Sequence, residues 1–115
     1  PYFKAGFAVA NIEYRLTSQA TAPAAIEDTR CALIYLIKNA NALHLDPNKI
    51  IIMGGSAGGH LALMGGLLQN NHIFDTNCMG VENINVAAII DKYGIADVND
   101  WAYGPYIKSS LQLIG

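Results

Sequence analysis

Apolar runs separated by polar residues predict three buried strands along the chain. Residues 6–13, "GFAVANIE", are short, apolar and bounded by polar residues, which indicates a buried strand. Residues 50–53, "IIIM", form a β-branched run that is too apolar to face water. Residues 86–94, "VAAIIDKYG", are the third strand candidate. The tail after residue 94 is expected to be a loop followed by the start of another helix.

Two segments between these strands have the pattern of helices. From Ala24 to about Ala40 the apolar residues share one helical face, with Thr21 as a candidate cap and Pro23 in the first turn. Residues 57 to about 69 predict a second helix despite four glycines, each about 1 kcal/mol less favourable than alanine. That penalty is tolerable if the helix backbone lies close against a sheet. Strands alternating with helices are typical of a parallel sheet with covering helices, so the predicted fold class is α/β.

The composition agrees with a buried sheet and excludes several classes of partner. Hydrophobic residues make up 52% and charged residues 14%, which suits strands buried on both faces or a piece of a larger core. The net charge is −2 without a basic run, which argues against a nucleic-acid partner. No window reaches the roughly 18 consecutive apolar residues of a membrane span. Cys31 and Cys78 are too few for a disulfide framework and lack metal-ligand spacing. They therefore do not indicate whether the protein lies in an oxidising or a reducing compartment.

The most specific motif is Gly54-Gly55-Ser56-Ala57-Gly58, which matches the G-x-S-x-G nucleophile elbow. The predicted strand before it and helix after it are the required context. Such a turn is strained, and side chains at the glycine positions would collide with the neighbouring strand or helix. It lifts the Ser56 hydroxyl above the sheet edge and directs the Ala57 N–H, with the helix dipole, at a developing oxyanion. Ser56 is therefore the candidate nucleophile and Ala57 a candidate oxyanion donor.

The alternatives for this motif are a simple tight turn and a phosphate-binding loop. The dinucleotide pattern G-x-G-x-x-G does not fit, because Ala57 stands at the third position after Gly54 and no acidic ribose partner is evident. The Walker pattern also fails, because no lysine follows the glycines. The sequence thus indicates neither a cofactor site nor a metal site.

Several motifs together resemble those of α/β-hydrolase esterases, most closely the acetylesterase and acetylxylan- or feruloyl-esterase-like bacterial enzymes. They are "YRL" (14–16), "PAAIEDT" (23–29), "LDPNKI" (45–50), "GGSAGGHLAL" (54–63) and the segment from "DKYG" onward. Related hormone-sensitive-lipase-type enzymes usually carry an acidic residue where Gly55 stands, which favours the acetylesterase side. The resemblance implies that residues 1–115 are the central part of a single, incomplete α/β-hydrolase domain whose two ends lie outside the chain.

The resemblance also implies a function. The whole protein would be a serine carboxylic ester hydrolase that forms an acyl-Ser56 intermediate and needs no metal or cofactor. Its substrates would be small-acyl esters, such as acetyl or feruloyl esters, including acylated carbohydrates. Arg15 and Asp28 occupy positions that the family keeps, and we expect them to tie the loop after the first strand to the helix.

A serine nucleophile needs a histidine base and an acid that orients it, and in this fold they follow in the order serine, acid, histidine. His44 precedes Ser56, His60 lies one helical turn after it, and His72 ends the following helix. We expect all three histidines to be structural or exposed. Asp97 is an alternative as the acid, although in these esterases the acid comes one strand later. The acid and base are therefore expected outside the chain.

Further parts of the fold are also expected before residue 1. These are a His-Gly-Gly loop with the remaining oxyanion donors, and a strand between those at 6–13 and 50–53. With that gap in the sheet, isolated residues 1–115 should be unstable or associate through exposed edges.

Other functional readings stay open at this point. A prolyl-oligopeptidase-like serine peptidase shares the elbow, and a truncated, non-catalytic chain is consistent with the missing base. Trp101, Tyr103 and Tyr106 are expected to anchor the next helix, with an aromatic substrate wall as the alternative. The oligomeric state and the acyl and alcohol specificity cannot be read from the sequence.

Overall fold

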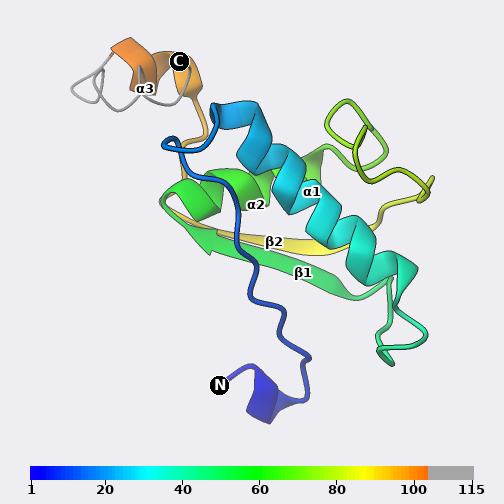
Figure 1. The fold of residues 1–115 in the computed structure, drawn as a ribbon. Coiled ribbons are helices and arrows are strands. Elements are labelled where there is room, and N and C mark those ends of the chain that lie inside the picture. Colours follow the sequence, from blue (N-terminus) through cyan, green and yellow to red (C-terminus); the bar gives the residue numbers. More distant parts are fainter. Residues whose placement is uncertain (104–115) are drawn as a thin grey trace.

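A computed structural model describes residues 1–103 of the chain, and its regular elements form a small α/β unit (Figure 1). In chain order these elements are the 3-10 helix η1 (Phe3–Ala5), α1 (Ala22–Lys38), β1 (Ile50–Gly55), α2 (Ala57–Leu67), β2 (Val86–Lys92) and α3 (Val98–Tyr103). The two predicted helices and the strands predicted at 50–53 and 86–94 are confirmed. Among these described residues, no helix is long and apolar enough to cross a membrane.

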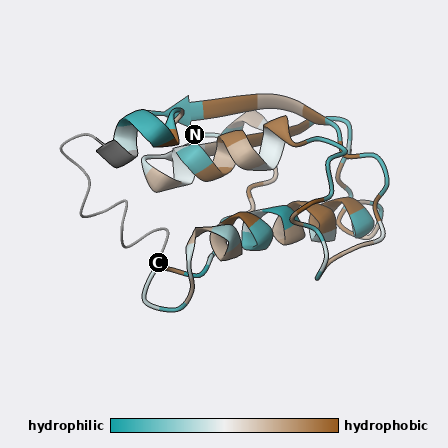
Figure 2. Ribbon diagram, turned by 90° about the horizontal axis from the view of Figure 1, so that it is seen from above, coloured by the Kyte–Doolittle hydropathy of each residue, from teal (hydrophilic) through white to brown (hydrophobic). Residues whose placement is uncertain are grey.

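The two strands form a parallel pair, and α2 is the crossover between them. The register runs from Ile50 opposite Val86 to Gly55 opposite Lys92, with an irregularity between Ile50 and Ile51. Viewed from above, α2 lies against the strands and α1 lies beyond it on the same side of the sheet (Figure 2). This β-α-β unit confirms the predicted α/β class, because parallel neighbours require such a crossover.

Helix α1 supplies most of the core. It begins at Ala22, after Thr21 in an extended conformation, and Pro23 lies in the first turn, where its missing N–H leaves no helical bond unmade. Leu33 and Ile34, on the predicted apolar face, are almost fully buried with Ile84. The side chains that pack around these three are Ile37, Ile50, Ile52, Cys78, Val81 and Val86. The core therefore lies between α1, the start of both strands and the loop that leads into β2.

The glycines of α2 let the helix approach its neighbours, as predicted. A Cβ built on Gly66 would lie 2.5 Å from the Cδ1 of Ile89 on β2. A Cβ on Gly59 would lie 2.2 Å from the Asp91 carboxylate, and one on Gly65 would lie 3.2 Å from the side chain of Thr29 on α1. Three of the four glycines thus offset their helix penalty by allowing close packing.

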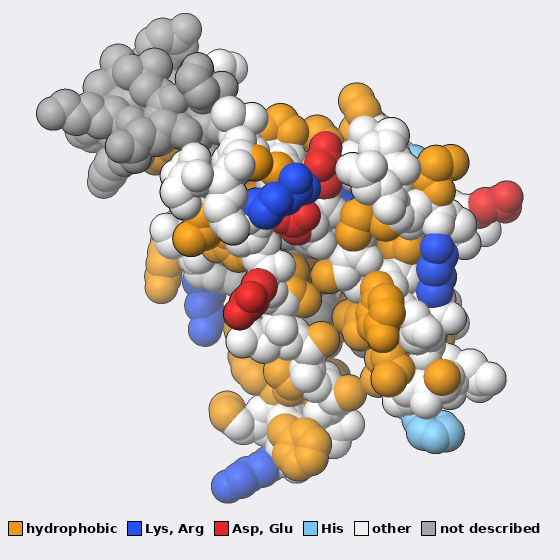
Figure 3. All heavy atoms as spheres, viewed as in Figure 1, with side chains coloured by type: hydrophobic (Ala, Val, Ile, Leu, Met, Phe, Trp, Pro, Cys, Tyr) orange, Lys and Arg blue, Asp and Glu red, His pale blue; other side chains and the backbone are white. Residues whose placement is uncertain are grey.

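The prediction of a strand at residues 6–13 is wrong. Residues 7–16 run beside the sheet without joining a ladder (Figure 1). Phe7 and Val9 are exposed, and hydrophobic side chains are visible on the surface of the described residues (Figure 3). The physical reason is that, within residues 1–103, no strand lies next to this segment to satisfy its N–H and C=O groups. A cavity of about 180 Å³ separates residues 10–14 from β1 and the start of α2.

The expectation that "IIIM" avoids water is also wrong for this unit. Ile50 and Ile52 face the helices, but Ile51 and Met53 are 42% and 41% exposed. Alternate side chains of a strand point to opposite faces, and in the described part of the chain both α1 and α2 cover the same face. The other face of β1 is therefore open.

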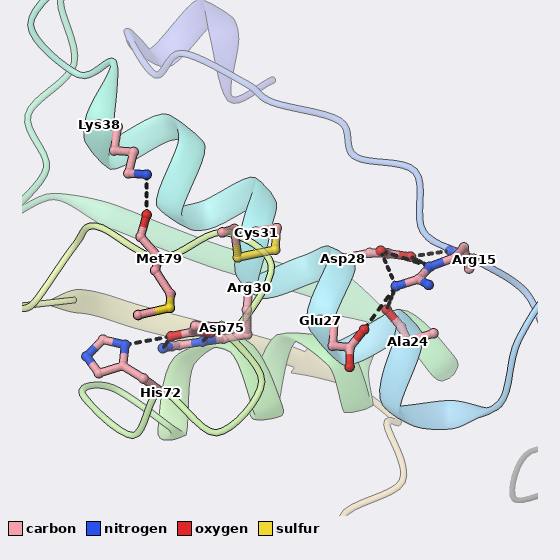
Figure 4. Close-up of a disulfide and its surroundings, with 11 residues drawn as sticks. Arg15, Ala24, Glu27, Asp28, Arg30, Cys31, Lys38, His72, Asp75 and Met79 are labelled. Carbon is pink, nitrogen blue, oxygen red and sulfur yellow. Dashed lines mark hydrogen bonds and ion pairs between the residues drawn. A yellow bond between two sulfur atoms is a disulfide. The ribbon is translucent and has the colours of Figure 1, made fainter.

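A disulfide between Cys31 and Cys78 holds the loop before β2 against α1 (Figure 4). The two Cα atoms are 5.3 Å apart, although 47 positions separate them in sequence. Lys38, at the end of α1, donates a hydrogen bond to the backbone carbonyl of Met79 in the same loop. The reading of these cysteines as too few for a disulfide framework missed this bridge, because spacing along the chain does not show which residues meet.

A buried ion pair holds the same loop from a second point. Arg30 on α1 is fully buried, and its Nε and Nη2 donate to the two Asp75 oxygens at 2.8 and 2.6 Å (Figure 4). The same guanidinium donates to the backbone carbonyls of Gly65 and Gln69, at the end of α2 and just beyond it. Burial by itself raises the pKa of Asp75, but the hydrogen bonds from Arg30 and His72 outweigh it and hold the pKa below its ordinary value. Arg30 therefore links both helices to the loop.

Candidate active site

Ser56 lies at the sharp turn between β1 and α2, at the carboxyl end of the sheet. Its backbone has φ 54° and ψ −120°, a conformation that non-glycine residues rarely adopt and that costs about 1–3 kcal/mol. The Ser56 N–H donates to the Lys92 carbonyl at 3.0 Å, and the His60 N–H donates to the Ser56 carbonyl at 3.1 Å. Sheet pairing on one side and the first helical bond on the other thus hold the strained turn. Ser56 itself is exposed.

The glycines around Ser56 differ in how strictly the turn requires them. A Cβ on Gly54 would lie 2.1 Å from the Gly58 carbonyl oxygen, so no side chain fits there. A Cβ on Gly55 would make ordinary contacts with the Tyr93 ring, at 3.4 Å or more. A Cβ on Gly58 would meet no described atom within 4 Å, so the expected collision at this position is not found.

Ala57 is the first residue of α2, and the positive end of the helix dipole lies at the serine. The first N–H groups of a helix have no acceptor inside the helix, so the Ala57 N–H is free of intrahelical bonding. An oxyanion that forms on a carbonyl held at Ser56 would meet this donor and the partial positive charge of the helix end.

The three histidines are engaged or positioned away from Ser56, as expected from the sequence. His60 Nδ1 lies 2.7 Å from the Ile95 carbonyl and holds the loop after β2 against α2. His72 lies 2.7 Å from the Asp75 carboxylate through Nδ1 and 3.1 Å from the Glu82 carbonyl through Nε2. His44 is exposed in the loop after α1.

Asp97 has a local role in the structure. It lies past the end of β2, and its Oδ1 accepts hydrogen bonds from the N–H groups of Asn99 and Asp100 at 2.9 and 3.1 Å. This is the arrangement of a helix cap at the start of α3. Of the aromatic residues near it, Trp101 on α3 is half-buried. The Tyr103 side chain and all of Tyr106 lie outside what the structure describes.

Arg15 and Asp28 tie the extended N-terminal segment to α1, which confirms their predicted structural role. The Arg15 Nε lies 3.1 and 2.9 Å from the two Asp28 oxygens, and the Arg15 backbone N–H adds a bond of 2.8 Å. The guanidinium also donates to Glu27 and to the Ala24 carbonyl (Figure 4). The hydrogen bond from Arg15 lowers the pKa of Asp28, and the same bond raises the pKa of Arg15.

Tyr93 is a residue beside Ser56 that the sequence reading did not select. It directly follows β2, whose last residue, Lys92, pairs with Gly55 and accepts the Ser56 N–H. No motif marks Tyr93, and only the register of two strands that are distant in sequence places it at the elbow.

Among the described residues, no three His, Cys, Asp or Glu side chains lie close enough together to hold a metal ion.

The chain is similar in sequence to a known protein family and to several named proteins. The BD-FAE family model matches residues 1–113. The chain is 38% identical to an acetyl esterase of Salmonella paratyphi B over 96 residues, covering 83% of this chain and 27% of that protein. It is 30% identical to the esterase LipC of Mycobacterium tuberculosis over 95 residues, covering 83% of this chain and 24% of the relative.

A shorter match has higher identity. An AB hydrolase superfamily protein of Schizosaccharomyces pombe is 46% identical over 54 residues, which is 47% of this chain and 16% of that protein. The chain thus spans about a quarter or less of the length of these relatives. The match along nearly the whole chain, together with the β-α-β unit and its elbow, shows that this chain belongs to the BD-FAE family and has part of an α/β-hydrolase fold.

Proposed function

We propose that residues 1–115 are the central part of a single α/β-hydrolase domain and that the whole protein is a carboxylic ester hydrolase with Ser56 as its nucleophile. The observation that carries this proposal is the exposed Ser56, held at φ 54° between a parallel strand and the first turn of α2. Relatives named as esterases support the reaction class.

In the proposed reaction, the Ser56 Oγ attacks the acyl carbonyl carbon of the ester and gives up its proton to a base. The carbonyl oxygen becomes an oxyanion that accepts a hydrogen bond from the Ala57 N–H. The bond to the alcohol then breaks, and the alcohol leaves with a proton, which gives acyl-Ser56. Water cleaves this intermediate and releases the carboxylic acid. The base and its orienting acid would come from outside residues 1–103, because His60 and His72 are bonded elsewhere.

For the substrate we propose small-acyl esters, such as acetyl or feruloyl esters, including acyl groups on carbohydrate. The Salmonella paratyphi B relative is named an acetyl esterase, which supports the acetyl group. The two steps above use only a serine, a base and amide donors, so the proposal requires no metal or cofactor.

Turnover of p-nitrophenyl acetate by the full-length protein tests the role of Ser56. We expect Ser56→Ala to lower kcat by about 10⁴-fold or more, because the covalent step is lost. Ser18→Ala is the matched control, since Ser18 is also exposed but lies in the loop before α1, and it should act as the wild type. If Ser56→Ala kept the native rate, the proposal would be wrong.

Two further measurements separate the alternatives. Faster cleavage of prolyl amides than of acetyl esters would favour a prolyl-oligopeptidase-like peptidase over an esterase. Labelling of Ser56 by a fluorophosphonate requires an activated hydroxyl. Stoichiometric labelling of the full-length protein would therefore exclude a non-catalytic chain.

A further inference from the structure

Tyr93 lies beside the nucleophile elbow because of strand register. Gly55 pairs with Lys92, so Ser56 and Tyr93 are the next residues along two neighbouring strands at the same edge of the sheet. A Cβ on Gly55 would lie 3.4 Å from the Tyr93 hydroxyl and 3.7 Å from its Cε2 and Cζ atoms. The outer part of the ring therefore lies next to the residue that precedes the nucleophile.

The backbone of Tyr93 is strained and held on both sides. Its φ is 49°, a left-handed conformation that is unfavourable for an aromatic residue. At the next residue, the Gly94 N–H donates to Asp91 Oδ1 at 2.8 Å. A Cβ on Gly94 would lie 2.5 Å from the backbone nitrogen of His60 on α2. The His60 ring then holds the Ile95 carbonyl. The turn after β2 is thus packed against α2, and these contacts fix the position of the Tyr93 backbone.

Among residues 1–103, little covers the Tyr93 side chain. Its exposed fraction is 84%, the largest among the exposed hydrophobic side chains of the described residues. A strained residue persists only where its surroundings over-determine it, and such residues cluster at functional sites. Here the strained turn presents a flat, largely apolar surface with a polar tip beside Gly55, the residue that precedes the exposed Ser56.

We propose that Tyr93 is a specificity-determining residue whose ring forms one wall of the ester site and packs against a planar group of the substrate. This inference rests on the proposed function, because it needs an ester held at Ser56. The planar group is an aromatic ring carried on either the acyl or the alcohol side of the ester. Face or edge contacts between such rings favour aromatic over aliphatic esters.

The test compares three esters in the full-length protein: methyl ferulate with an aromatic acyl group, phenyl acetate with an aromatic alcohol, and ethyl acetate with neither. Tyr93→Gly removes the ring and suits a positive φ, and Tyr93→Asn is a second truncation that tolerates this backbone. Tyr93→Phe keeps the ring and is the matched control. We expect the truncations to raise KM about three- to tenfold for one or both aromatic esters and less than twofold for ethyl acetate.

The pattern of KM changes decides the inference. A rise for methyl ferulate alone places the wall on the acyl side, and a rise for phenyl acetate alone places it on the alcohol side. An equal change for all three esters, or none, overturns the proposal for Tyr93. Fluorophosphonate labelling of Ser56 in each variant reports that the elbow is intact. Activity retained by Ser56→Ala would instead overturn the proposed function, whatever the Tyr93 variants show.

Discussion

Gly54→Ala is the substitution that most directly tests how the elbow is built. In the structure, the added methyl would lie 2.1 Å from the Gly58 carbonyl oxygen and 2.3 Å from its carbon. Both are backbone atoms, so no side-chain rotation relieves the contact. The end of β1 and the first turn of α2 must separate, and Ser56 lies between them.

The size of this effect follows from the distances. An ordinary contact to a Cβ begins at 3.4 Å, so the two elements must move apart by about 1 Å. Overpacking of this kind typically costs about 1–3 kcal/mol of folding free energy. A displacement of about 1 Å at a reacting group lowers the rate about 100-fold. We therefore expect Gly54→Ala to lose about 2 kcal/mol of stability and about 100-fold in kcat/KM.

The assay is urea unfolding together with ester hydrolysis by the full-length protein. Gly55→Ala is the matched control, because it adds the same methyl one residue later, where the nearest atom is the Tyr93 hydroxyl at 3.4 Å. We expect Gly55→Ala to stay within about threefold of the wild-type rate, since ordinary contacts need no backbone shift. Equal effects of the two variants would refute the steric argument.

Two further predictions concern the loop before β2. Replacing Cys31 and Cys78 by serine should lower the free energy of unfolding by about 4 kcal/mol, the loop-closure value for their 47-residue separation, measured by urea unfolding against wild type without reductant. An unchanged midpoint would contradict this. Asp75→Asn should cost about 3–5 kcal/mol, because it leaves the buried Arg30 charge uncompensated. Because folding lowers the pKa of Asp75, the ionised carboxylate contributes to the free energy of unfolding above its unfolded pKa of about 3.9, and this contribution is lost as the pH falls through the folded pKa. Urea midpoints measured between pH 3 and pH 7 should show this loss in the wild type and not in Asp75→Asn.

Local patterns predicted the elements of this fold where each element's own residues determine it. The helical face of Leu33 and Ile34, and the elbow between a β-branched strand and a glycine-rich helix, depend on residues close together in sequence. The segment at 6–13 has an equally strong strand pattern but does not form a strand, because a strand also needs a neighbour to complete its hydrogen bonds. An apolar pattern therefore indicates that a segment can form a strand, but whether it does so depends on a neighbouring strand that pairs with it.

Contacts between distant residues account for what the sequence did not show. Arg30 and Asp75 are 45 residues apart, and the two cysteines are 47 apart, so no local pattern joins them. Tyr93 reaches the elbow only through the register of β2 on β1. Conversely, Arg15 and Asp28 were assigned correctly because family resemblance carries contact information that a single sequence lacks.

The long-range contacts also divide the molecule into two functionally different ends. The disulfide, the Arg30 ion pair and the core around Ile84 lie toward the start of the strands and the end of α2. The strained Ser56 and Tyr93 lie at the opposite ends of β1, β2 and α2, where Gly94 and His60 hold the turns. Because the two groups of contacts share no side chain, changes in them should be largely additive and separable. Removing the disulfide should therefore lower stability while leaving kcat unchanged at temperatures where the protein stays folded, whereas Gly54→Ala should lower both.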